Sequence, residues 1–420
     1  MPTNRIEAEY LLETPADPRR VADLMAGEQS SGTFVAIPGE TPELKARVAA
    51  QVIRLEILDE TAISPSLPSA RLNPPPGAPF QRARVTMSWP LDTLGPSLPN
   101  LLATVAGNLF ELKPVTGLRL LDIHLPDEFA AVYPGPRFGI AGTRRLAGVK
   151  ERPLIGTIIK PSVGLGPRET AELVNDLCRA GIDFIKDDEL QSDGPACPFD
   201  QRVEEVMRVI NDQSQRSGKK VMYAFNLTGD LDQMRRRHDT LLKHGATCLM
   251  ASINSVGLVG MVELARFSQL PIHAHRNGWG YLSRHPLLGW SYIAWQKIWR
   301  LAGADHMHVN GIGNKFAESD ESCIASARAC LTPMFADKPC TVMPVFSSAQ
   351  SALQAPETYR GLGSADLIVT AGGGIMAHPL GVVAGVTAMQ ESWEATLAGI
   401  PLTEFARNHP SLQHALEMTA

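Results

Sequence analysis

The sequence predicts an α/β protein in which a C-terminal (β/α)8 barrel follows an N-terminal α+β domain of ferredoxin-like type. The chain has 420 residues, of which 44% are hydrophobic and 20% charged. This length suits one or two large domains, and this composition excludes a disordered chain. From residue 154 onward, short apolar runs alternate with amphipathic segments, whereas the first 135 residues show no such rhythm. We therefore expect two domains, at residues 1–135 and 136–420.

The first domain reads as a small layered structure. Apolar alternation predicts strands at residues 6–12, 52–58, 84–89 and 118–125, and helical periodicity predicts helices at residues 15–25 and 98–110. A proline-rich connection at residues 63–79 separates two of these strands. Because no strand–helix crossover pattern appears, a largely antiparallel sheet is expected. The segment Tyr133-Pro134-Gly135-Pro136 is typical of a domain boundary.

The second domain shows eight strand-like runs with helical segments between them. The strands are expected at residues 154–160, 184–189, 221–227, 247–253, 271–276, 306–309, 341–346 and 366–370. The helices are expected at residues 168–180, 199–213, 231–244, 260–267, 289–301 and 320–331. Eight such units in about 250 residues are typical of a (β/α)8 barrel. A doubly wound open sheet is the alternative, but no glycine-rich fingerprint follows the first strand.

Charge and composition exclude several classes of partner. The formal net charge of −5 argues against a nucleic-acid binder that relies on bulk positive charge. The six cysteines form no C-x-x-C pair, so buried reduced thiols are expected. The N-terminus has no apolar signal region, and no run approaches the roughly 18 apolar residues of a membrane span. We expect a cytoplasmic protein without membrane contact.

The predicted strand ends carry an unusual number of polar groups. In a barrel, the residues at the carboxyl ends of the strands surround one pocket. Here these positions hold Lys160, Lys186, Asp187, Asp188, Glu189, Asn226, Asn254, His275, Arg276, His308, Asn310, Ser347 and Ser348. A single one of them would be an ordinary surface group, but together they predict an active site.

The second strand end is the most informative. Strand alternation in residues 184–189 puts Lys186 and Asp188 on one side, with Glu189 at the turn. Two carboxylates are hard oxygen ligands that suit Mg²⁺. Lys186 would then serve either as a counter-ion or, capped by CO₂ as a carbamate, as a third oxygen ligand. An ordinary salt-bridged strand end is the alternative.

A second theme is phosphate binding. Gly372-Gly373-Gly374 after the eighth strand can offer backbone N–H groups to an anion, and Arg276 and His308 can supply charged donors. Barrels often bind phosphate after strands seven and eight. The glycine-rich loop at residues 310–315 ends in Lys315 and is typical of a mobile lid. A tight turn and a plain flexible loop are the alternatives.

Several of these motifs resemble the large subunit of ribulose-bisphosphate carboxylase/oxygenase (RuBisCO). They are Glu28-Gln29-Ser30-Ser31-Gly32-Thr33, Gly107-Asn108, Gly156-Thr157-Ile158-Ile159-Lys160-Pro161, residues 183–189, His273-Ala274-His275-Arg276 and the glycine triplet. The resemblance extends over nearly the whole chain. It implies a homodimer in which Glu28, Thr33 and Asn108 complete the partner's active site.

The resemblance also implies a role for each matching residue. Lys186 would be the lysine carbamylated by CO₂, with Asp188 and Glu189 as the other Mg²⁺ ligands. Lys160 would move protons at the enediolate, His275 would lie near the reacting carbons, and Lys315 would be the lid lysine. The implied contacts to the substrate or its phosphates are Arg276, His308, Ser347, Gly372 and Gly373.

The departures from the carboxylase pattern indicate a RuBisCO-like protein that is not a carboxylase. The family's Lys-Pro-Lys becomes Lys160-Pro161-Ser162, and its Ser-Gly-Gly becomes Ser347-Ser348-Ala349. The lid segment at residues 308–315 also differs, and the chain is shorter than a true large subunit. Lys160-Pro161 and Gly164-Leu165 are kept, in contrast to the methylthio-sugar enolases of the family.

These features predict a Mg²⁺-dependent decarboxylase of a phosphorylated β-keto sugar acid, of the 3-oxo-isoapionate 4-phosphate type, acting through a metal-stabilised enediolate. A transcarboxylase/hydrolase that splits the same substrate is the first alternative. An isomerase or enolase of a (methylthio)ketose phosphate, a binding protein that keeps the site as a relic, and true carboxylation are the others. The exact substrate, the carbamylation of Lys186 and assembly beyond a dimer stay open.

Overall fold

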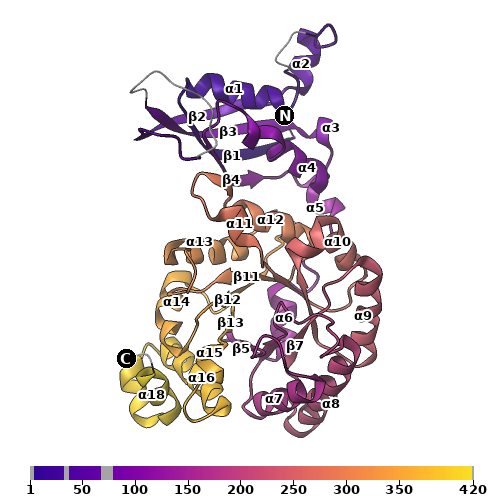
Figure 1. Cartoon of the computed structure of the whole chain (residues 1–420), viewed down its shortest axis with the longest axis vertical. Helices are drawn as coiled ribbons and strands as arrows, with labels where there is room; N and C mark the ends of the chain where they lie inside the picture. The colour runs from indigo at the N-terminus through magenta and orange to yellow at the C-terminus, as the bar shows by residue number, and fades with distance from the viewer. Residues whose placement is uncertain (1–3, 33–36, 68–78, 419–420) are drawn as a thin grey trace. The chain divides into compact units, whose positions relative to one another are not determined.

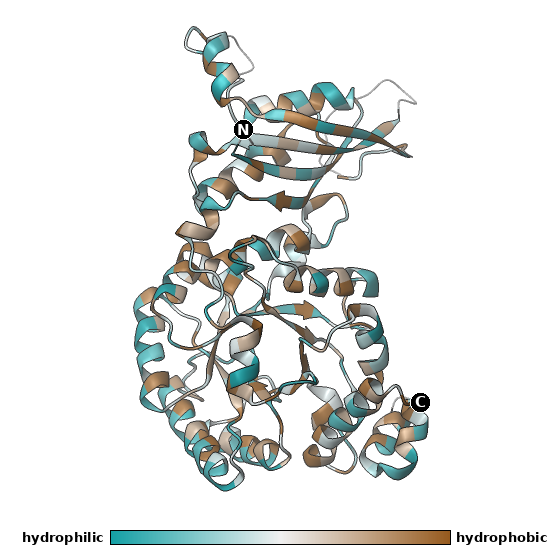
Figure 2. Ribbon diagram, turned by 180° about the vertical axis from the view of Figure 1, so that it is seen from behind, coloured by the Kyte–Doolittle hydropathy of each residue, from teal (hydrophilic) through white to brown (hydrophobic). Residues whose placement is uncertain are grey.

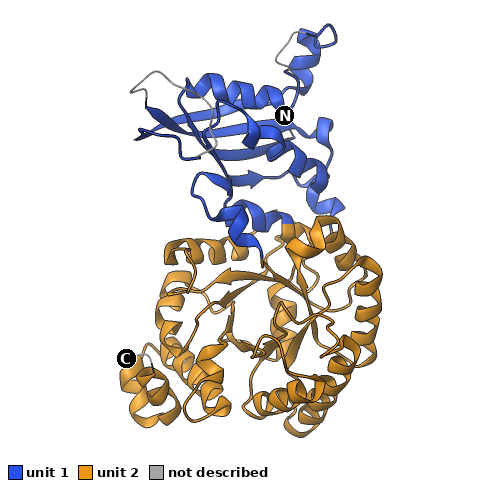
Figure 3. Cartoon of the chain, viewed as in Figure 1, with its two compact units in different colours: residues 1–133, 278–298 blue, residues 134–277, 299–420 orange. Residues whose placement is uncertain are grey.

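A computed structural model describes residues 4–32, 37–67 and 79–418. The chain divides into two compact units (Figure 3): residues 1–133 with 278–298, and residues 134–277 with 299–420. The first division lies near the boundary that the sequence suggests after residue 135. The inclusion of residues 278–298 in the first unit is not evident from the sequence.

The first unit contains a five-stranded mixed sheet (Figure 1). Its strands are β1 (Arg5–Thr14), β2 (Gln51–Ala62), β3 (Phe80–Pro90), β4 (Gly117–His124) and β10 (Leu288–Trp290), in the order β10-β4-β1-β3-β2. The pairs β1–β3, β1–β4 and β2–β3 are antiparallel, whereas β10 joins β4 in parallel. In β1, the alternate residues Ile6, Ala8, Tyr10 and Leu12 are buried. This alternation explains why the strand could be recognised from the sequence.

The helices of the first unit are shorter than or shifted from the predicted ones. They are α1 (Pro18–Glu28), α2 (Pro42–Val48), α3 (Leu91–Leu94), α4 (Leu98–Val105), α5 (Glu128–Val132), α11 (Trp279–Ser283) and the start of α12 (Tyr292–Ala302). The helix predicted at residues 98–110 ends at Val105. At Gly107 a Cβ would lie 2.3 Å from the carbonyl oxygen of Ala103, so the chain leaves the helix where only glycine fits.

The second unit is a closed barrel of eight parallel strands, which confirms the predicted fold class. The strands are β5 (Leu154–Ile158), β6 (Phe184–Lys186), β7 (Met222–Asn226), β8 (Cys248–Ser252), β9 (Ile272–His275), β11 (His306–Asn310), β12 (Met343–Ser347) and β13 (Ile368–Thr370). Pairing of β13 with β5 closes the ring, and β9 pairs directly with β11. The predicted helix at residues 289–301 is wrong at its start, because Leu288–Trp290 form β10 in the other sheet.

Helices surround the barrel strands. They are α6 (Gly139–Ala147), α7 (Pro167–Arg179), α8 (Phe199–Ser217), α9 (Leu231–Lys243), α10 (Ile253–Phe267), α13 (Asp320–Leu331), α14 (Ala355–Leu362), α15 (Gly373–Met376), α16 (Val382–Ala398), α17 (Leu402–Phe405) and α18 (Pro410–Glu417). In α7 the buried residues Thr170, Ala171, Val174 and Leu177 follow helical spacing. The outward faces carry the hydrophilic residues (Figure 2).

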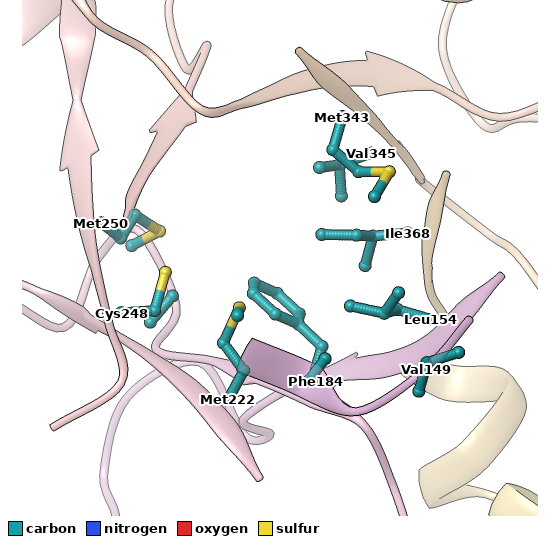
Figure 4. Close-up of a cluster of buried hydrophobic side chains, with 11 residues drawn as sticks. Val149, Leu154, Phe184, Met222, Cys248, Met250, Met343, Val345 and Ile368 are labelled. Atoms are coloured by element: carbon teal, nitrogen blue, oxygen red, sulfur yellow. The ribbon is translucent and has the colours of Figure 1, made fainter. Parts of the chain in front are cut away.

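The starts of the barrel strands build an apolar core. Leu154, Phe184, Met222, Cys248, Met343 and Ile368 are the first residues of their strands, and all are fully buried. Figure 4 shows these side chains together with Val149, Met250 and Val345. Because this end of the barrel is filled by apolar side chains, polar chemistry is left to the opposite strand ends.

Two further expectations can be compared with the structure. All six cysteines are free thiols, and all except Cys178 are buried. Among the described residues, none of the helices combines the length and apolar character needed to cross a lipid bilayer.

Candidate active site

Most of the barrel strands begin with an apolar residue and end with a polar one. Seven strands end in a polar side chain that is at least nine-tenths buried: Lys186, Asn226, Ser252, His275, Asn310, Ser347 and Thr370. Burying polar groups costs free energy unless they are paired. A ring of them at one end of a barrel is therefore the arrangement of a binding or catalytic pocket.

Lys186 is the most buried charged group of this ring. Its Nζ donates to the carbonyl oxygen of Asp187 at 2.7 Å and to Oε2 of Glu189 at 3.3 Å. Burial lowers the pKa of Lys186, although the neighbouring carboxylates partly oppose this shift. A lysine with a lowered pKa has a larger neutral fraction, and the neutral amine is the form that reacts with an electrophile such as CO₂.

Asp188 joins Lys186 and Glu189 to the end of β5. The Nζ of Lys160 donates to Oδ2 of Asp188 at 2.7 Å, and the other oxygen of Asp188 accepts from the backbone N–H of Leu190 at 3.1 Å. The Asp188 side chain is 3% exposed and the Lys160 side chain 40%. Lys160 is thus anchored by a buried carboxylate while part of its side chain stays accessible to a ligand.

His275 extends the cluster on the side of Glu189. Its Nε2 lies 3.4 Å from Oε2 of Glu189, and its Nδ1 accepts from the backbone N–H of Asn277 at 3.2 Å. Burial lowers the pKa of His275 to about 4, so the ring is neutral at pH 7, with its proton on Nε2. Burial raises the pKa of Glu189, but nearby positive charge and the hydrogen bonds from Lys186 and the backbone together lower it to about 2.

His308 and Ser347 follow on neighbouring strands. The ring centres of His275 and His308 are 4.5 Å apart, and Oγ of Ser347 lies 3.0 Å from Nδ1 of His308. Burial lowers the pKa of His308 well below its usual value. The structure therefore places His308 next to His275, and Ser347 next to His308, as neutral hydrogen-bonding groups.

Arg276 is buried and pairs with a carboxylate of the segment after β11. Its Nη2 donates to Oε2 of Glu318 at 2.9 Å, and Nδ2 of Asn310 donates to the same oxygen at 2.7 Å. In this segment Lys315 is exposed, with its Nζ 5.5 Å from the ring centre of Phe316. The structure does not join Lys315 to the buried cluster.

The glycine triplet lies beside Lys160. A Cβ on Gly372 would be 3.7 Å from Cε of Lys160, and a Cβ on Gly373 would meet no atom within 4 Å. The first part of the triplet therefore borders the cluster and leaves open space next to it. Direct binding of phosphate by Gly372 and Gly373 stays a prediction.

The remaining predicted site residues belong to the first unit. Nδ2 of Asn108 donates to Oε1 of Glu28 at 3.2 Å, so these two residues form a pair. Thr33 lies outside the described residues. The role of all three in a partner's site stays a prediction.

The donor chemistry of the cluster suits a hard divalent cation after one modification. Among the described residues, no group of three or more His, Cys, Asp or Glu side chains is arranged to hold a metal ion. Asp188 and Glu189 supply two carboxylates beside Lys186. An ammonium group cannot be a ligand, but a carbamate on the buried Lys186 would complete an oxygen set of the kind Mg²⁺ prefers.

Comparison with known proteins identifies the family. Residues 139–419 match the model of the ribulose bisphosphate carboxylase large chain, catalytic domain, and residues 6–129 match that of its N-terminal domain. The chain belongs to the ribulose bisphosphate carboxylase large-chain family. It is a RuBisCO-like protein.

Relatives within this family narrow the comparison. The chain is 58% identical to the 3-oxo-isoapionate-4-phosphate transcarboxylase/hydrolase of Xanthobacter autotrophicus, covering 99% of both chains. It is 46% identical to the 3-oxo-isoapionate-4-phosphate decarboxylase of Rhizobium rhizogenes, covering 97% of this chain and 96% of that one. A rubisco-like protein from Burkholderia fungorum has a TM-score of 0.92 at 49% identity, with 99% of both chains covered. An octameric Rubisco from Pyrococcus horikoshii has a TM-score of 0.88 at 31% identity, covering 100% and 94%.

Two residues next to the cluster were not singled out from the sequence of this RuBisCO-like chain. Arg202 of α8 is fully buried and donates from Nε to Oδ2 of Asp187 at 3.2 Å. An arginine on the apolar helix face formed by Phe199, Val203 and Val206 is a sequence pattern that indicates a buried, paired charge. Glu318 had no such signal, because its partner Arg276 is 42 residues away in the sequence.

Proposed function

We propose that this RuBisCO-like enzyme acts on 3-oxo-isoapionate 4-phosphate, a phosphorylated β-keto sugar acid, and detaches its carboxyl group to form an enediolate. The observation that carries this proposal is the cluster of Lys160, Asp188, Lys186, Glu189 and His275 at the barrel strand ends, of which Asp188, Lys186 and His275 are buried. It combines a proton donor, two carboxylates and a buried amine within hydrogen-bonding distances. Relatives at 58% and 46% identity carry this substrate in their names.

The chemistry follows from where charge develops. When the bond to the carboxyl group breaks, CO₂ leaves and the electron pair moves onto the neighbouring carbonyl, which gives the enediolate. The Nζ of Lys160 is held by Asp188 and Ser162 at 2.7 Å each, so it can present a proton to the enediolate carbon. A positioned general acid contributes about 10²–10⁴-fold to such a step. His275, neutral with its proton on Nε2, can donate a hydrogen bond to a developing oxyanion.

Mg²⁺ is the cofactor that fits this site. Lys186, as a carbamate formed with CO₂, would hold it together with Asp188 and Glu189. The bound ion would supply Lewis-acid stabilisation of the negative charge on the enediolate oxygens. Burial lowers the pKa of Lys186, which supports carbamate formation because only the neutral amine attacks CO₂. The other assignments remain those of the sequence: Ser347, Arg276, His308, Gly372 and Gly373 as substrate contacts and Lys315 as a lid residue.

For the complete reaction we favour the transcarboxylase/hydrolase course. In this course the enediolate takes CO₂ back on its other carbon, which leaves a ketone next to the new carboxylate. Water then adds to this ketone and splits the bond between the two former enediolate carbons. The ketone carbon becomes one acid, and the carbon with the transferred carboxylate is protonated to give the other. The 58% identity to a relative of that name supports it. Loss of CO₂ to solution followed by protonation of the enediolate, the decarboxylase course predicted first from the sequence, is the second candidate. Its support is the 46% identity over 97% of the chain to named decarboxylases.

Products of a carboxyl-labelled substrate separate the possibilities. Purified protein with Mg²⁺ and bicarbonate is incubated with 3-oxo-isoapionate 4-phosphate carrying ¹³C in its carboxyl group. Label retained in a new carboxylic acid supports transfer and hydrolysis, whereas label released quantitatively as CO₂ supports decarboxylation. Solvent-proton exchange without cleavage of a carbon–carbon bond would instead indicate an isomerase or enolase. No change in the substrate would refute the proposal, and Lys186→Met serves as the inactive control.

We further propose that the protein is a cytoplasmic homodimer with shared active sites, in which Glu28, Thr33 and Asn108 face the partner's barrel. The hydrogen bond between Asn108 and Glu28 supports a common role. Six free thiols fit a reducing compartment. Mixing Glu28→Gln with Lys186→Met subunits tests the shared site. If both variants are inactive alone, a fully exchanged 1:1 mixture should regain about a quarter of the activity, because about half of the dimers are mixed and each of these has one intact site. No recovery after verified subunit exchange would contradict sharing.

A further inference from the structure

Arg276 and Glu318 form a largely buried ion pair at the carboxyl ends of the barrel strands. Arg276 follows β9, and Glu318 lies between β11 and α13. The side chains are 7% and 16% exposed, and Nη2 of Arg276 lies 2.9 Å from Oε2 of Glu318. Because both groups are largely removed from water, their charges are weakly screened and each strongly influences the neighbouring space.

The Glu318 carboxylate is held by several donors. Its Oε2 accepts from Arg276 and from Nδ2 of Asn310 at 2.7 Å, and its Oε1 accepts from Oγ of Ser322 at 3.0 Å. Its backbone carbonyl also accepts from Nδ2 of Asn314 at 3.2 Å. These bonds fix the position of the carboxylate beside Arg276 at the barrel strand ends.

A fixed carboxylate changes what Arg276 can bind. An arginine that faces a pocket alone is well suited to a phosphate, because its planar donors match phosphate oxygens. Beside Glu318 the positive charge is already compensated, and a dianionic phosphate at Arg276 would also lie near a negative carboxylate. Specificity of this kind comes from an unfavourable contact with the wrong ligand as much as from a favourable one with the right ligand.

We propose that Glu318 is a specificity-determining residue that prevents a second phosphate from binding at Arg276. The enzyme then accepts a keto-sugar acid with one phosphate and discriminates against sugar bisphosphates. The hydroxylated, uncharged end of the substrate would lie against the Arg276–Glu318 pair. This inference rests on the proposed function for the identity of the substrate, and on the ion pair for the selectivity.

The test compares two ligands that differ by a single phosphate. Binding of ribulose 5-phosphate and ribulose 1,5-bisphosphate is measured by titration calorimetry, without turnover. In the wild-type protein the bisphosphate should bind no more than about 3-fold tighter than the monophosphate. In Glu318→Gln, which keeps the size of the side chain and removes its charge, the bisphosphate should become about 10-fold or more tighter.

Matched variants show whether the tighter binding of the bisphosphate in Glu318→Gln depends on Arg276. Glu321→Gln removes one charge at the start of α13 from an exposed side chain, and it should leave the ratio of affinities at the wild-type value. Combining Glu318→Gln with Arg276→Met should abolish the gain. Glu318→Ser provides a second variant if Glu318→Gln does not fold.

Two results would overturn the inference. The first is a wild-type protein that already binds the bisphosphate at least 10-fold tighter. The second is an unchanged ratio in a folded Glu318 variant, including no binding of either ligand. Because the binding measurement needs no catalysis, it can refute the role of Glu318 even if the protein turns over the keto acid as proposed. Conversely, absence of turnover would refute the proposed function without deciding the affinity ratio.

Discussion

The Nζ of Lys160 donates a 2.7 Å hydrogen bond to Oδ2 of Asp188, which joins the end of β5 to the end of β6. Asp188 is buried and Lys160 is 40% exposed in its side chain. The carboxylate we propose as a metal ligand therefore also positions the amine we propose as the proton donor. A change in either residue should affect the other.

Replacing Lys160 by methionine should remove the proton donor with little effect on folding. We expect kcat to fall by about 10²–10⁴-fold, the range typical for the loss of a general acid. The melting temperature should change little because the side chain is partly exposed and its ion pair is partly screened. Steady-state kinetics and thermal unfolding measure the two effects.

Ser162 provides the control for this prediction. Its Oγ accepts from Lys160 at 2.7 Å, but Lys160 keeps Asp188 as a partner when the serine is lost. Ser162→Ala should therefore lower kcat by less than about 10-fold, the scale of one modest hydrogen bond. Retention of more than a tenth of the wild-type kcat by Lys160→Met would exclude Lys160 as the proton donor.

Activity should depend on both Mg²⁺ and CO₂. Chelation of the metal should abolish turnover, and Mg²⁺ with bicarbonate should restore it. Both are needed because CO₂ supplies the carbamate, which would be the third oxygen ligand of the Mg²⁺ ion. The ¹³C NMR spectrum of protein in labelled bicarbonate should contain a carbamate signal that Lys186→Met lacks. Lys220→Met is the control, since Nζ of Lys220 binds the carbonyl oxygen of Gly245 and takes no part in the cluster. A signal that persists in Lys186→Met would contradict carbamylation of Lys186.

The barrel could be predicted because its signals are local. Each strand is a short apolar run, and polar residues such as Lys186 and Ser347 mark where the runs end. The strand Leu288–Trp290 could not be found in this way, because it pairs with β4, whose residue Leu118 lies far away in the sequence. Its three residues acquire strand geometry only from that long-range pairing, and their local pattern continues the following helix.

In the candidate site, too, local features could be predicted from the sequence and long-range pairings could not. The motif around Lys186, Asp188 and Glu189 is contiguous, so its composition indicated a carboxylate and lysine cluster. The pairing of Arg276 with Glu318 depends on how the segment after β11 folds, and that fold is set by tertiary hydrogen bonds. Sequence reasoning assigned Arg276 to a phosphate from its motif alone, and this assignment stays a prediction. The neighbouring carboxylate could not be identified from the sequence.

The buried ion pair behind the cluster should be important for stability. Arg202 and Asp187 have side chains 0% and 1% exposed, and Asp187 also accepts from the hydroxyl of Tyr223 at 2.6 Å. Arg202→Met would leave a buried carboxylate without its counter-charge, which costs about 3–5 kcal/mol. Urea unfolding of Arg202→Met measures this loss.

Arg208 on the same helix is the matched control. It pairs with Glu205, but its side chain is 68% exposed. Such surface pairs contribute about 0–1 kcal/mol, so Arg208→Met should unfold close to the wild-type urea concentration. Equal losses in the two variants would show that helix α8 is sensitive to any substitution, independent of the ion pair.

His306 should make the folded protein sensitive to acid. Burial lowers the pKa of His306 to about 3, whereas an unfolded histidine has a pKa of about 6.5. The unfolded state therefore takes up a proton first as the pH falls. The stabilising contribution is complete above pH 6.5 and is lost progressively toward pH 3, with about 2 kcal/mol lost by pH 5.

A comparison of variants isolates this effect from that of the neighbouring Asp305. Burial raises the pKa of Asp305 to about 6, so its contribution has the opposite sign and decreases as the pH rises through 6. Between pH 7 and 5, the free energy of unfolding of His306→Gln should decrease by about 2 kcal/mol less than that of the wild type. His124→Gln, at a side chain 60% exposed, is the control and should follow the wild type. Parallel pH profiles for His306→Gln and the wild type would contradict the prediction.

Gly373 should affect substrate binding without affecting the fold. A Cβ at Gly373 meets no atom within 4 Å, so Gly373→Ala should keep the wild-type melting temperature. If the backbone N–H groups of the triplet approach a phosphate, the added methyl group should raise KM by about 10-fold through lost hydrogen bonds. At Gly374, in contrast, a Cβ would lie 2.6 Å from the carbonyl oxygen of Gln350, so Gly374→Ala should lower the melting temperature. An unchanged KM in a stable Gly373→Ala protein would place the phosphate elsewhere in the pocket.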